Sequence, residues 1–294
     1  MATYNGEQFI SQQIKSILEQ SYQEFVLFIN DDASTDNTYN IAVKFSKSHP
    51  DKIFVTRNQT NSGGAKHNFL SMMIKCRDDY VMLCDQDDVW FPDKIEKTLK
   101  KMKQQEQIYP DYPLLVHSDL KVVDENLNII SSSYEKYMNS NFSRTAFNQV
   151  LIQNTFAGCS AMYNRATANL LRVEPSYCVM HDWWLELVVA TFGHITHIDE
   201  PTVLYRQHKN NAIGTNAKKK LNASYIKNAI HETFEQAKSL LELYENDLTD
   251  SQRDILKKYC DISNVSKMNR WLSLCKLRAF KIGILRNIAL FIYV

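Results

Sequence analysis

Two clusters of carboxylates come directly after strand-like apolar segments of the sequence. Residues 85–88, with the sequence DQDD, follow the apolar run 80–84, and residues 30–32 follow the run 25–29. Three carboxylates within four residues repel one another, and a bound divalent cation would relieve that repulsion. Hard oxygen ligands favour Mg²⁺ or Mn²⁺, and such an ion also holds phosphate oxygens. The alternative is a solvated acidic turn that caps the helix at Pro92, because Asp is favoured at helix N-termini.

The second cluster suits contact with a nucleoside. A carboxylate in residues 30–32 could accept a hydrogen bond from a base N–H or a ribose hydroxyl, while Ser34 or Asp36 caps the next helix. Residues 61–64, with the sequence NSGG, form a turn that a nucleotide could approach closely. A Gly-Gly pair is more often only a loop, so the turn by itself indicates little.

The elements around these clusters predict an α/β fold with a mainly parallel sheet flanked by helices. Strands are expected at 25–29, 53–56, 80–84, 114–117, 121–123, 159–163, 194–197 and 202–205, and helices at 7–20, 35–47, 65–75, 146–153 and 182–191. Ligands of such sheets bind beyond the carboxyl ends of the strands, where both acidic clusters are expected. No apolar run precedes Thr3, so a first strand is expected to be missing from the sheet.

The pattern changes after residue 214 and predicts two regions, a catalytic domain at 1–215 and a helical C-terminal appendix at 216–294. A helix at 224–244 has one apolar face, and Thr249 with Gln252 predicts a capping box for the next helix. Residues 263–294 contain six basic side chains and no acidic one, interleaved with apolar side chains. This tail is typical of a basic amphipathic helix on an anionic membrane surface. The alternative is a helix packed on its own domain with a solvated basic side.

Composition narrows the class of protein. The 34 basic and 33 acidic residues nearly cancel, so the chain as a whole has no electrostatic attraction to nucleic acid. Its six cysteines form no CxxC pair, and no signal peptide is recognisable, which favours reduced thiols and a cytoplasmic location. No apolar run reaches the roughly 18 residues of a membrane-spanning helix. No pattern indicates an organic cofactor.

Four segments in this order and spacing resemble family 2 glycosyltransferases, which have the GT-A fold of nucleotide-diphospho-sugar transferases. They are TYNGE at 3–7, DDASTD at 31–36, NSGG at 61–64 and DQDDVW at 85–90, and the resemblance extends over about residues 1–210. The later segments NTFAGC at 154–159 and HDWW at 181–184 are most similar to bacterial rhamnosyltransferases of cell-wall and capsule polysaccharide assembly.

The resemblance implies roles for the matching residues. Asp182 is the general base, with an N-cap of the helix as the structural alternative. The metal, Mn²⁺ or Mg²⁺, is held by Asp87, with Asp85 and His208. The nucleotide sugar is bound by Thr3, Tyr4, Glu7, Asp31, Asn61, Gly63, Asp85, Gln86 and Arg206. The acceptor is contacted by Gly158, Cys159 and Trp183.

The implied reaction is an inverting transfer of L-rhamnose from dTDP-L-rhamnose to a saccharide hydroxyl. The basic tail favours a lipid-linked acceptor at the inner face of the cell membrane. Alternatives are a UDP-hexose or UDP-N-acetylhexosamine donor, and a catalytically inactive protein that binds a nucleotide sugar or glycan. A nucleotidyltransferase is disfavoured because no glycine-rich basic loop for a triphosphate is present. The QxxRW motif of processive members is also absent, which favours addition of one or a few sugars.

Overall fold

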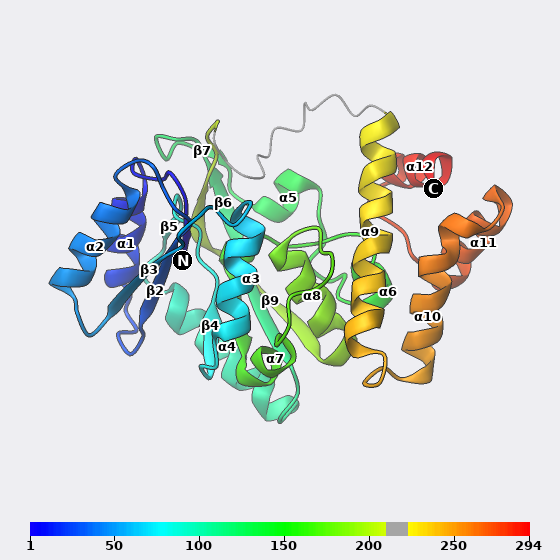
Figure 1. Cartoon of the computed structure of the whole chain (residues 1–294), viewed down its shortest axis with the longest axis horizontal. Coiled ribbons are helices and arrows are strands. Elements are labelled where there is room, and N and C mark those ends of the chain that lie inside the picture. Colours follow the sequence, from blue (N-terminus) through cyan, green and yellow to red (C-terminus); the bar gives the residue numbers. More distant parts are fainter. Residues whose placement is uncertain (210–222) are drawn as a thin grey trace.

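The computed structural model describes residues 1–209 and 223–294, which build a core of sheets and helices followed by a group of C-terminal helices (Figure 1). The first sheet contains β1 (Ala2–Thr3), β2 (Leu27–Asp31) and β3 (Ile53–Arg57), in the order β1-β2-β3 and parallel throughout. Helices α1 (Ile10–Leu18) and α2 (Thr38–Ser48) connect these strands. Helix α1 buries Ile10, Ile14 and Ile17, the spacing of a single helical face.

The second sheet is mixed, whereas the sequence predicted a mainly parallel one. Its order is β4 (Tyr80–Met82), β8 (Ala161–Asn164), β6 (Leu114–Val123), β9 (His194–Arg206) and β5 (Val89–Trp90), with β7 (Ile129–Ser131) paired to β6. Of these pairs only β6 and β9 are parallel. The tight turn after β6, in which Asp124 accepts backbone N–H groups of Asn126 and Asn128, can join only antiparallel strands. Apolar periodicity identifies strands but does not encode their direction.

Ala2 and Thr3 form a short first strand, β1, which the sequence did not predict. Ala2 and Thr3 pair in parallel with Asn30 and Asp31. The Ala2 N–H also donates to the Cys84 carbonyl at 3.3 Å, so β1 lies against the segment that follows β4. Two residues are too few for a periodic signal, which is why the sequence did not reveal this strand.

The other helices of the first 209 residues pack around the strands. They are α3 (Ala65–Lys75), α4 (Lys94–Ile108), α5 (Tyr134–Met138), α6 (Phe147–Val150), α7 (Arg165–Leu170) and α8 (His181–Phe192), together with a 3₁₀ turn at Gly158–Ser160. Helix α8 is buried on nearly all sides, with Trp184, Leu185 and Val188 in the core. A helix that is apolar all round is fixed by its surroundings, so polar groups on it are held in place as well.

The C-terminal region is helical, as predicted. It contains α9 (Ala223–Tyr244), α10 (Asp250–Cys260), a 3₁₀ turn (Asp261–Asn264), α11 (Lys267–Leu277) and α12 (Ile284–Tyr293). Thr249 and Gln252 form the predicted capping box of α10. The boundary predicted between residues 215 and 216 lies outside the described residues. One apolar cluster joins the two predicted regions, because it includes Leu115 and Trp184 as well as Leu256 and Leu290.

This shared cluster predicts that the C-terminal helices and the sheets unfold together. Leu256 of α10 has no exposed surface, so Leu256→Ala should lower the free energy of unfolding by about 2–5 kcal/mol. Thermal denaturation followed by far-UV circular dichroism should then show one transition at a lower temperature. Two separate transitions would contradict the shared core. The matched control is Met268→Ala on α11, where the side chain is 71% exposed and truncation should change stability by less than about 0.5 kcal/mol.

Candidate active site

The loop between β4 and β5 contains the first two of the predicted metal ligands. The Oδ2 atom of Asp87 lies 2.8 Å from Nε2 of His208, and both side chains are largely buried. His208 comes two residues after β9 ends at Arg206, so this pair joins segments 121 residues apart. The structure therefore brings Asp87 and His208 together, an arrangement with one oxygen and one nitrogen donor.

Asp85 lies in the same loop and is electrostatically linked to two other carboxylates. Its pKa is raised to about 7, mainly by burial and then by the charges of Asp87 and Asp182. Such a group is only partly ionised near neutral pH. A divalent cation close to it would favour the ionised form, so the residues present here fit a metal such as Mn²⁺ or Mg²⁺.

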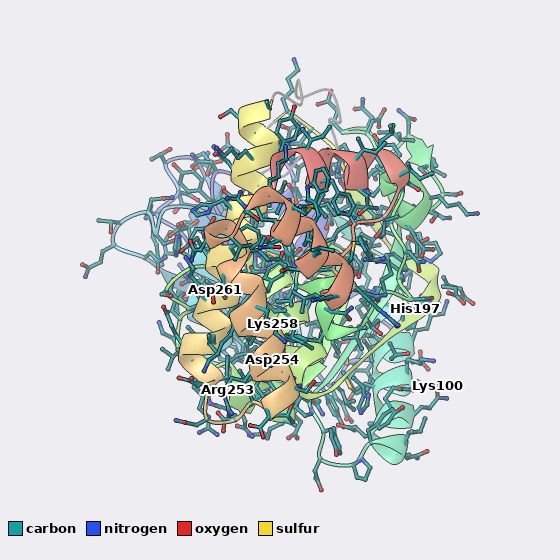
Figure 2. The ribbon with its side chains drawn as sticks, turned by 90° about the vertical axis from the view of Figure 1, so that its right-hand side faces the viewer. Lys100, His197, Arg253, Asp254, Lys258 and Asp261 are labelled. Carbon is teal, nitrogen blue, oxygen red and sulfur yellow. The ribbon has the colours of Figure 1, made fainter. Side chains whose placement is uncertain are left out.

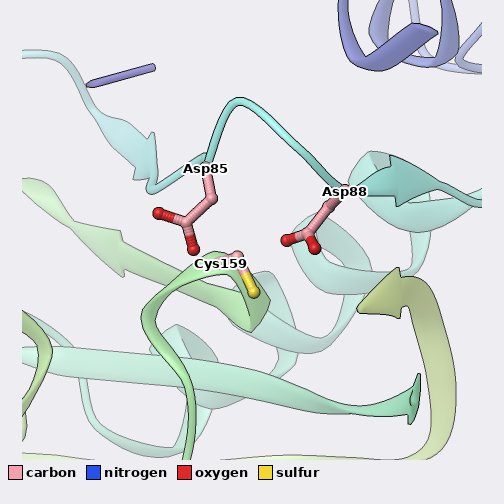
Figure 3. A group of neighbouring side chains, drawn as sticks. All are labelled: Asp85, Asp88 and Cys159. Atoms are coloured by element: carbon pink, nitrogen blue, oxygen red, sulfur yellow. The ribbon is translucent and has the colours of Figure 1, made fainter. Parts of the chain in front are cut away.

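A second group of possible metal ligands, which the sequence did not predict, lies beside the first. Oxygen atoms of Asp85 and Asp88 and the sulfur of Cys159 lie within 4.8 Å of one another, and all three side chains point into the same space (Figure 3). Asp88 is fully buried, and its Oδ1 accepts the backbone N–H of Arg206 at 3.0 Å. Among the described residues no hydrogen-bond partner is found for its Oδ2. The sequence pointed to the DQDD cluster as a whole, and nothing in it distinguished Asp88 from its neighbours.

Asp182 lies in the first turn of α8. Its Oδ2 accepts the Gly158 backbone N–H at 3.1 Å, and its Oδ1 accepts the Trp183 N–H at 2.7 Å. Burial raises the pKa of Asp182 to about 6 in spite of these hydrogen bonds, which favour the ionised form. The helix cap is Met180, so the alternative role of Asp182 as an N-cap is wrong. A buried carboxyl with a pKa near 6 is suited to accept a proton at neutral pH.

The residues predicted to bind the nucleoside gather at the carboxyl end of the first sheet. Asp31 is fully buried, and its carboxylate accepts the Ser34 N–H at 3.0 Å and the Thr3 hydroxyl at 3.3 Å. Arg57, which the sequence did not single out, forms an ion pair with Asp31 at 3.2 Å and lies over the Tyr39 ring. Asp31 is therefore held rigidly by the protein itself.

The loop after β1 is tied to the DQDD loop by one side chain. The Gln86 amide accepts the Tyr4 N–H and donates to the Tyr4 carbonyl, both at 2.9 Å. A Cβ atom on Gly6 would lie 2.3 Å from the Gln86 side chain, so only glycine leaves room for this contact. Gln86 thus positions the backbone beside Tyr4, whose ring is exposed.

The other residues predicted to bind the nucleotide sugar lie in loops at the same end of the sheet. Glu7 accepts the Asn37 N–H at 2.9 Å, and Asn61 donates to the Asp32 carbonyl at 3.2 Å. Gly63 has a φ of 98°, a conformation that favours glycine. These contacts fix the loops, and direct binding of a donor by Glu7, Asn61 and Gly63 stays a prediction.

Arg206 is buried and fixes the loop that carries Asp87. Its guanidinium donates to the Asp87 carbonyl at 2.7 Å, to the Gln12 side chain at 2.6 Å and to the Glu125 carbonyl at 2.5 Å. Its positive charge is therefore next to Asp87 and Asp88, whereas the predicted contact with a diphosphate stays a prediction.

The predicted acceptor residues lie close to Asp182. Gly158 donates its N–H to Asp182, and a Cβ atom at this position would lie 3.1 Å from the Asp182 Cβ. The Trp183 indole donates to the Val150 carbonyl at 2.7 Å, which orients its partly buried ring. Cys159 is buried and faces Asp85 and Asp88, so it lies deeper than its predicted position at the acceptor.

A large apolar cavity of about 960 Å³ lies apart from these groups. It separates β2 from β4, and Leu27, Phe69 and Met73 are among the residues that line it. None of the predicted site residues lines it. The candidate site is therefore the loop edge of the two sheets.

A protein family model described as Glycosyl transferase family 2 matches residues 1–170 of this chain. A dTDP-rhamnosyl transferase, RfbG of Shigella flexneri, is 34% identical over 230 residues, which cover 74% of each chain. Among solved structures, S. aureus TarS 1-349 with UDP-GlcNAc gives a TM-score of 0.58 at 14% identity and covers 94% of this chain and 78% of that one. A mannosyltransferase of Pyrobaculum calidifontis with GDP-Man and Mn²⁺ gives 0.52 at 17% identity, over 99% and 76%. These two structural likenesses concern the fold.

The pairing of Asp87 with His208 predicts a measurable metal site. Asp87→Asn and His208→Ala should each weaken Mn²⁺ binding by at least about tenfold, because each removes one donor atom. Titration of Mn²⁺ followed by electron paramagnetic resonance would measure this. His197→Ala is a matched control, because the partly exposed His197 of β9 forms a similar pair with Asp199 at 3.2 Å. Equal Mn²⁺ affinity in all three variants and the wild type would contradict the site.

Proposed function

The chain belongs to glycosyl transferase family 2, and on that premise we propose that it is an inverting, metal-dependent rhamnosyltransferase. It is a glycosyltransferase of the GT-A fold. The proposed donor is dTDP-L-rhamnose and the proposed acceptor is a saccharide hydroxyl in bacterial cell-surface polysaccharide assembly. The relative from Shigella flexneri, named for dTDP-rhamnosyl transfer, supports this donor through its similarity over three quarters of both chains.

The observation that carries the proposal is the convergence of carboxylates from two distant segments, the DQDD loop and the start of α8. Asp182 accepts the Gly158 N–H at 3.1 Å, and the next residue, Cys159, places its sulfur within 4.8 Å of oxygens of Asp85 and Asp88. A proton acceptor therefore lies within electrostatic range of the proposed metal ligands. Transfer from a nucleotide diphosphate needs this combination, a group that stabilises the departing diphosphate and a base for the incoming hydroxyl.

The chain's own residues supply the proton transfer. When bound, Mn²⁺ or Mg²⁺ would be held by Asp87, His208 and Asp85 and would neutralise charge on the leaving diphosphate. The carboxylate of Asp182 accepts the acceptor's hydroxyl proton as the hydroxyl oxygen forms a bond to the anomeric carbon. The bond from that carbon to the diphosphate oxygen breaks on the opposite side, and the oxygen leaves with the electron pair. One displacement of this kind inverts the anomeric centre, so a β-linked donor gives an α-rhamnoside.

Two alternatives would give different results. A UDP-hexose or UDP-N-acetylhexosamine transferase would use the same carboxylates with another donor pocket. An inactive protein would bind a nucleotide sugar or glycan without turnover. Calorimetric titration with dTDP-rhamnose, UDP-glucose and UDP-N-acetylglucosamine, each with Mn²⁺, and a transfer assay distinguish these cases.

The C-terminal tail is proposed to hold the enzyme on the inner face of the cell membrane, where a lipid-linked acceptor would be presented. Helices α11 and α12 meet where the Trp271 indole donates to the Phe291 carbonyl at 2.6 Å. Each helix exposes apolar side chains at helical spacing. We call these exposed side chains the tail surface: Met268, Trp271, Leu272, Ile284, Leu285, Ile288 and Ile292. No helix among the described residues has both the length and the apolar character needed to cross a membrane.

Charge favours an anionic lipid surface as the partner of the tail surface. The basic residues of the tail are Lys267, Arg270, Lys276, Arg278, Lys281 and Arg286, and residues 263–294 contain no acidic one. Helix α10, which packs against α11, carries both signs; Figure 2 labels Asp254 and Lys258 on it, and their side chains form an ion pair at 2.6 Å. Apolar side chains flanked only by positive charge are typical of helices that lie in a lipid interface.

Replacing Asp182 tests the catalytic assignment. Asp182→Asn should leave donor binding intact and lower the transfer rate by at least about a hundredfold, because the amide cannot accept the proton. In the wild type the rate should fall as the pH drops through about 6, since the raised pKa of Asp182 leaves the base protonated below that value. Rate measurements from pH 5 to 8 would show both effects. The control is Glu174→Gln, which makes the same change at an exposed acidic side chain. If Asp182→Asn transfers sugar at the wild-type rate, Asp182 is not the base.

Membrane binding can be measured by flotation with vesicles. The double variant Ile284→Asp, Leu285→Asp should lose binding to vesicles of phosphatidylcholine and phosphatidylserine, because it removes the two most exposed apolar side chains of the tail surface and adds negative charge. The matched control is Ile129→Asp, Ile130→Asp on β7, which makes the same charge change at two exposed residues elsewhere. Equal flotation of both double variants would exclude the tail surface.

A further inference from the structure

A buried carboxyl one helical turn beyond Asp182 has no place in the mechanism above. Glu186 has no exposed surface. Its Oε1 accepts the Thr155 hydroxyl at 2.5 Å, and its Oε2 accepts the Thr155 backbone N–H at 3.3 Å. Because residues four apart on a helix share a face, Asp182 and Glu186 are both directed at the segment 154–158.

The two carboxyl groups hold this segment at two points. Asp182 accepts the Gly158 backbone N–H at 3.1 Å, at the end of the segment. Glu186 accepts both hydrogen bonds from Thr155, three residues earlier. The Asn154 side-chain oxygen meanwhile accepts the Phe156 N–H at 3.0 Å, which closes a local turn. The donor that reaches Asp182 therefore lies on a segment that Glu186 anchors.

We propose that Glu186 is a positioning residue for the catalytic base, acting through Thr155 to hold the Gly158 N–H on the Asp182 carboxylate. This inference rests on the proposed function of Asp182 and deepens it. Hydrogen bonds to a carboxylate favour its ionised form, so the anchor keeps Asp182 able to accept a proton although it is buried. The same anchor fixes the direction in which the carboxylate points toward the acceptor hydroxyl.

The surroundings of Asp182 contain several other ionisable groups. Asp85 faces it from the loop after β4, Tyr134 from the start of α5 and Cys178 from the segment before α8. His181 precedes it on α8 and stacks on Phe69 at 4.0 Å. Glu186 is a further one among the described residues, and burial raises its pKa to about 8. A substitution at Thr155 alters none of these groups chemically, so it isolates the effect of the anchor.

The test compares Thr155→Val, which removes the hydroxyl at nearly constant volume, with Thr155→Ser, which keeps it. Thr155→Val should lower kcat by about tenfold to a hundredfold and leave the dissociation constant of the donor unchanged, because the base is displaced and the donor loops are not. The acid limb of the rate profile should move to higher pH by about half a unit to one unit, because lost hydrogen bonds raise the pKa of Asp182. Thr155→Ser should restore both.

A control and a direct titration complete the experiment. Thr233→Val removes a comparable buried hydroxyl, bonded to Tyr259 at 2.8 Å away from α8, and should leave the profile unchanged. The Asp182 carboxyl can be titrated by ¹³C NMR in every variant, with Asp182→Asn to assign its signal. A Thr155→Val protein with wild-type kcat and an unmoved Asp182 titration would overturn the proposal. If the wild type transfers no sugar, the proposed function fails, whereas the NMR titration still decides the role of Glu186.

Discussion

The site depends on holding several carboxyl groups together where water is largely excluded. Asp85, Asp87 and Asp88 lie in one loop, and the charge of Asp182 on α8 acts on Asp85. Burial and mutual repulsion both raise the pKa of Asp85 and of Asp88, and burial alone raises that of Asp182. Such a cluster opposes folding unless donors and positive charge are built around it. Much of the surrounding structure serves that need.

Arg206 and the segment 154–158 are the two main supports. Arg206 ends β9, gives its backbone N–H to Asp88 and its guanidinium to the Asp87 carbonyl, and extends to Gln12 of α1. The last residue of the long strand β9 thus fixes the DQDD loop. On the other side, Gly158 presents a backbone N–H to Asp182, and a Cβ atom there would crowd the Asp182 Cβ at 3.1 Å. Both supports rely on backbone positions that the sheets and α8 determine, which couples the geometry of the site to the whole core.

The sequence revealed the parts of this arrangement that leave a local signal. The DQDD cluster, the Asp31 segment and the capping box at Thr249 were found because acidic residues after apolar runs, and Thr paired with Gln three residues on, are visible within a few positions. Asp182 and His208 were found through resemblance to a family. The mixed pairing of the second sheet and the two-residue β1 were missed, because strand direction and very short strands leave no periodic trace. Arg57 and Glu186 were missed because their partners lie 26 and 31 residues away in sequence.

Glu186 also shows why sequence reasoning undervalues buried polar groups. In the sequence it sits in HDWWLELVV, where a Glu on an apolar helix resembles a solvent-facing interruption. The structure places it in the core with both oxygens used by a single threonine. A hydrophobic side chain of similar volume would pack there at no electrostatic cost, so stability alone does not account for a carboxyl at this position. What a carboxyl adds is direction, because its two oxygens fix the Thr155 hydroxyl and N–H at once and so determine where the next three residues run. The segment that needs this direction is the one that delivers the Gly158 N–H to Asp182, which makes the base, its hydrogen-bond donor and their anchor parts of one unit built on α8.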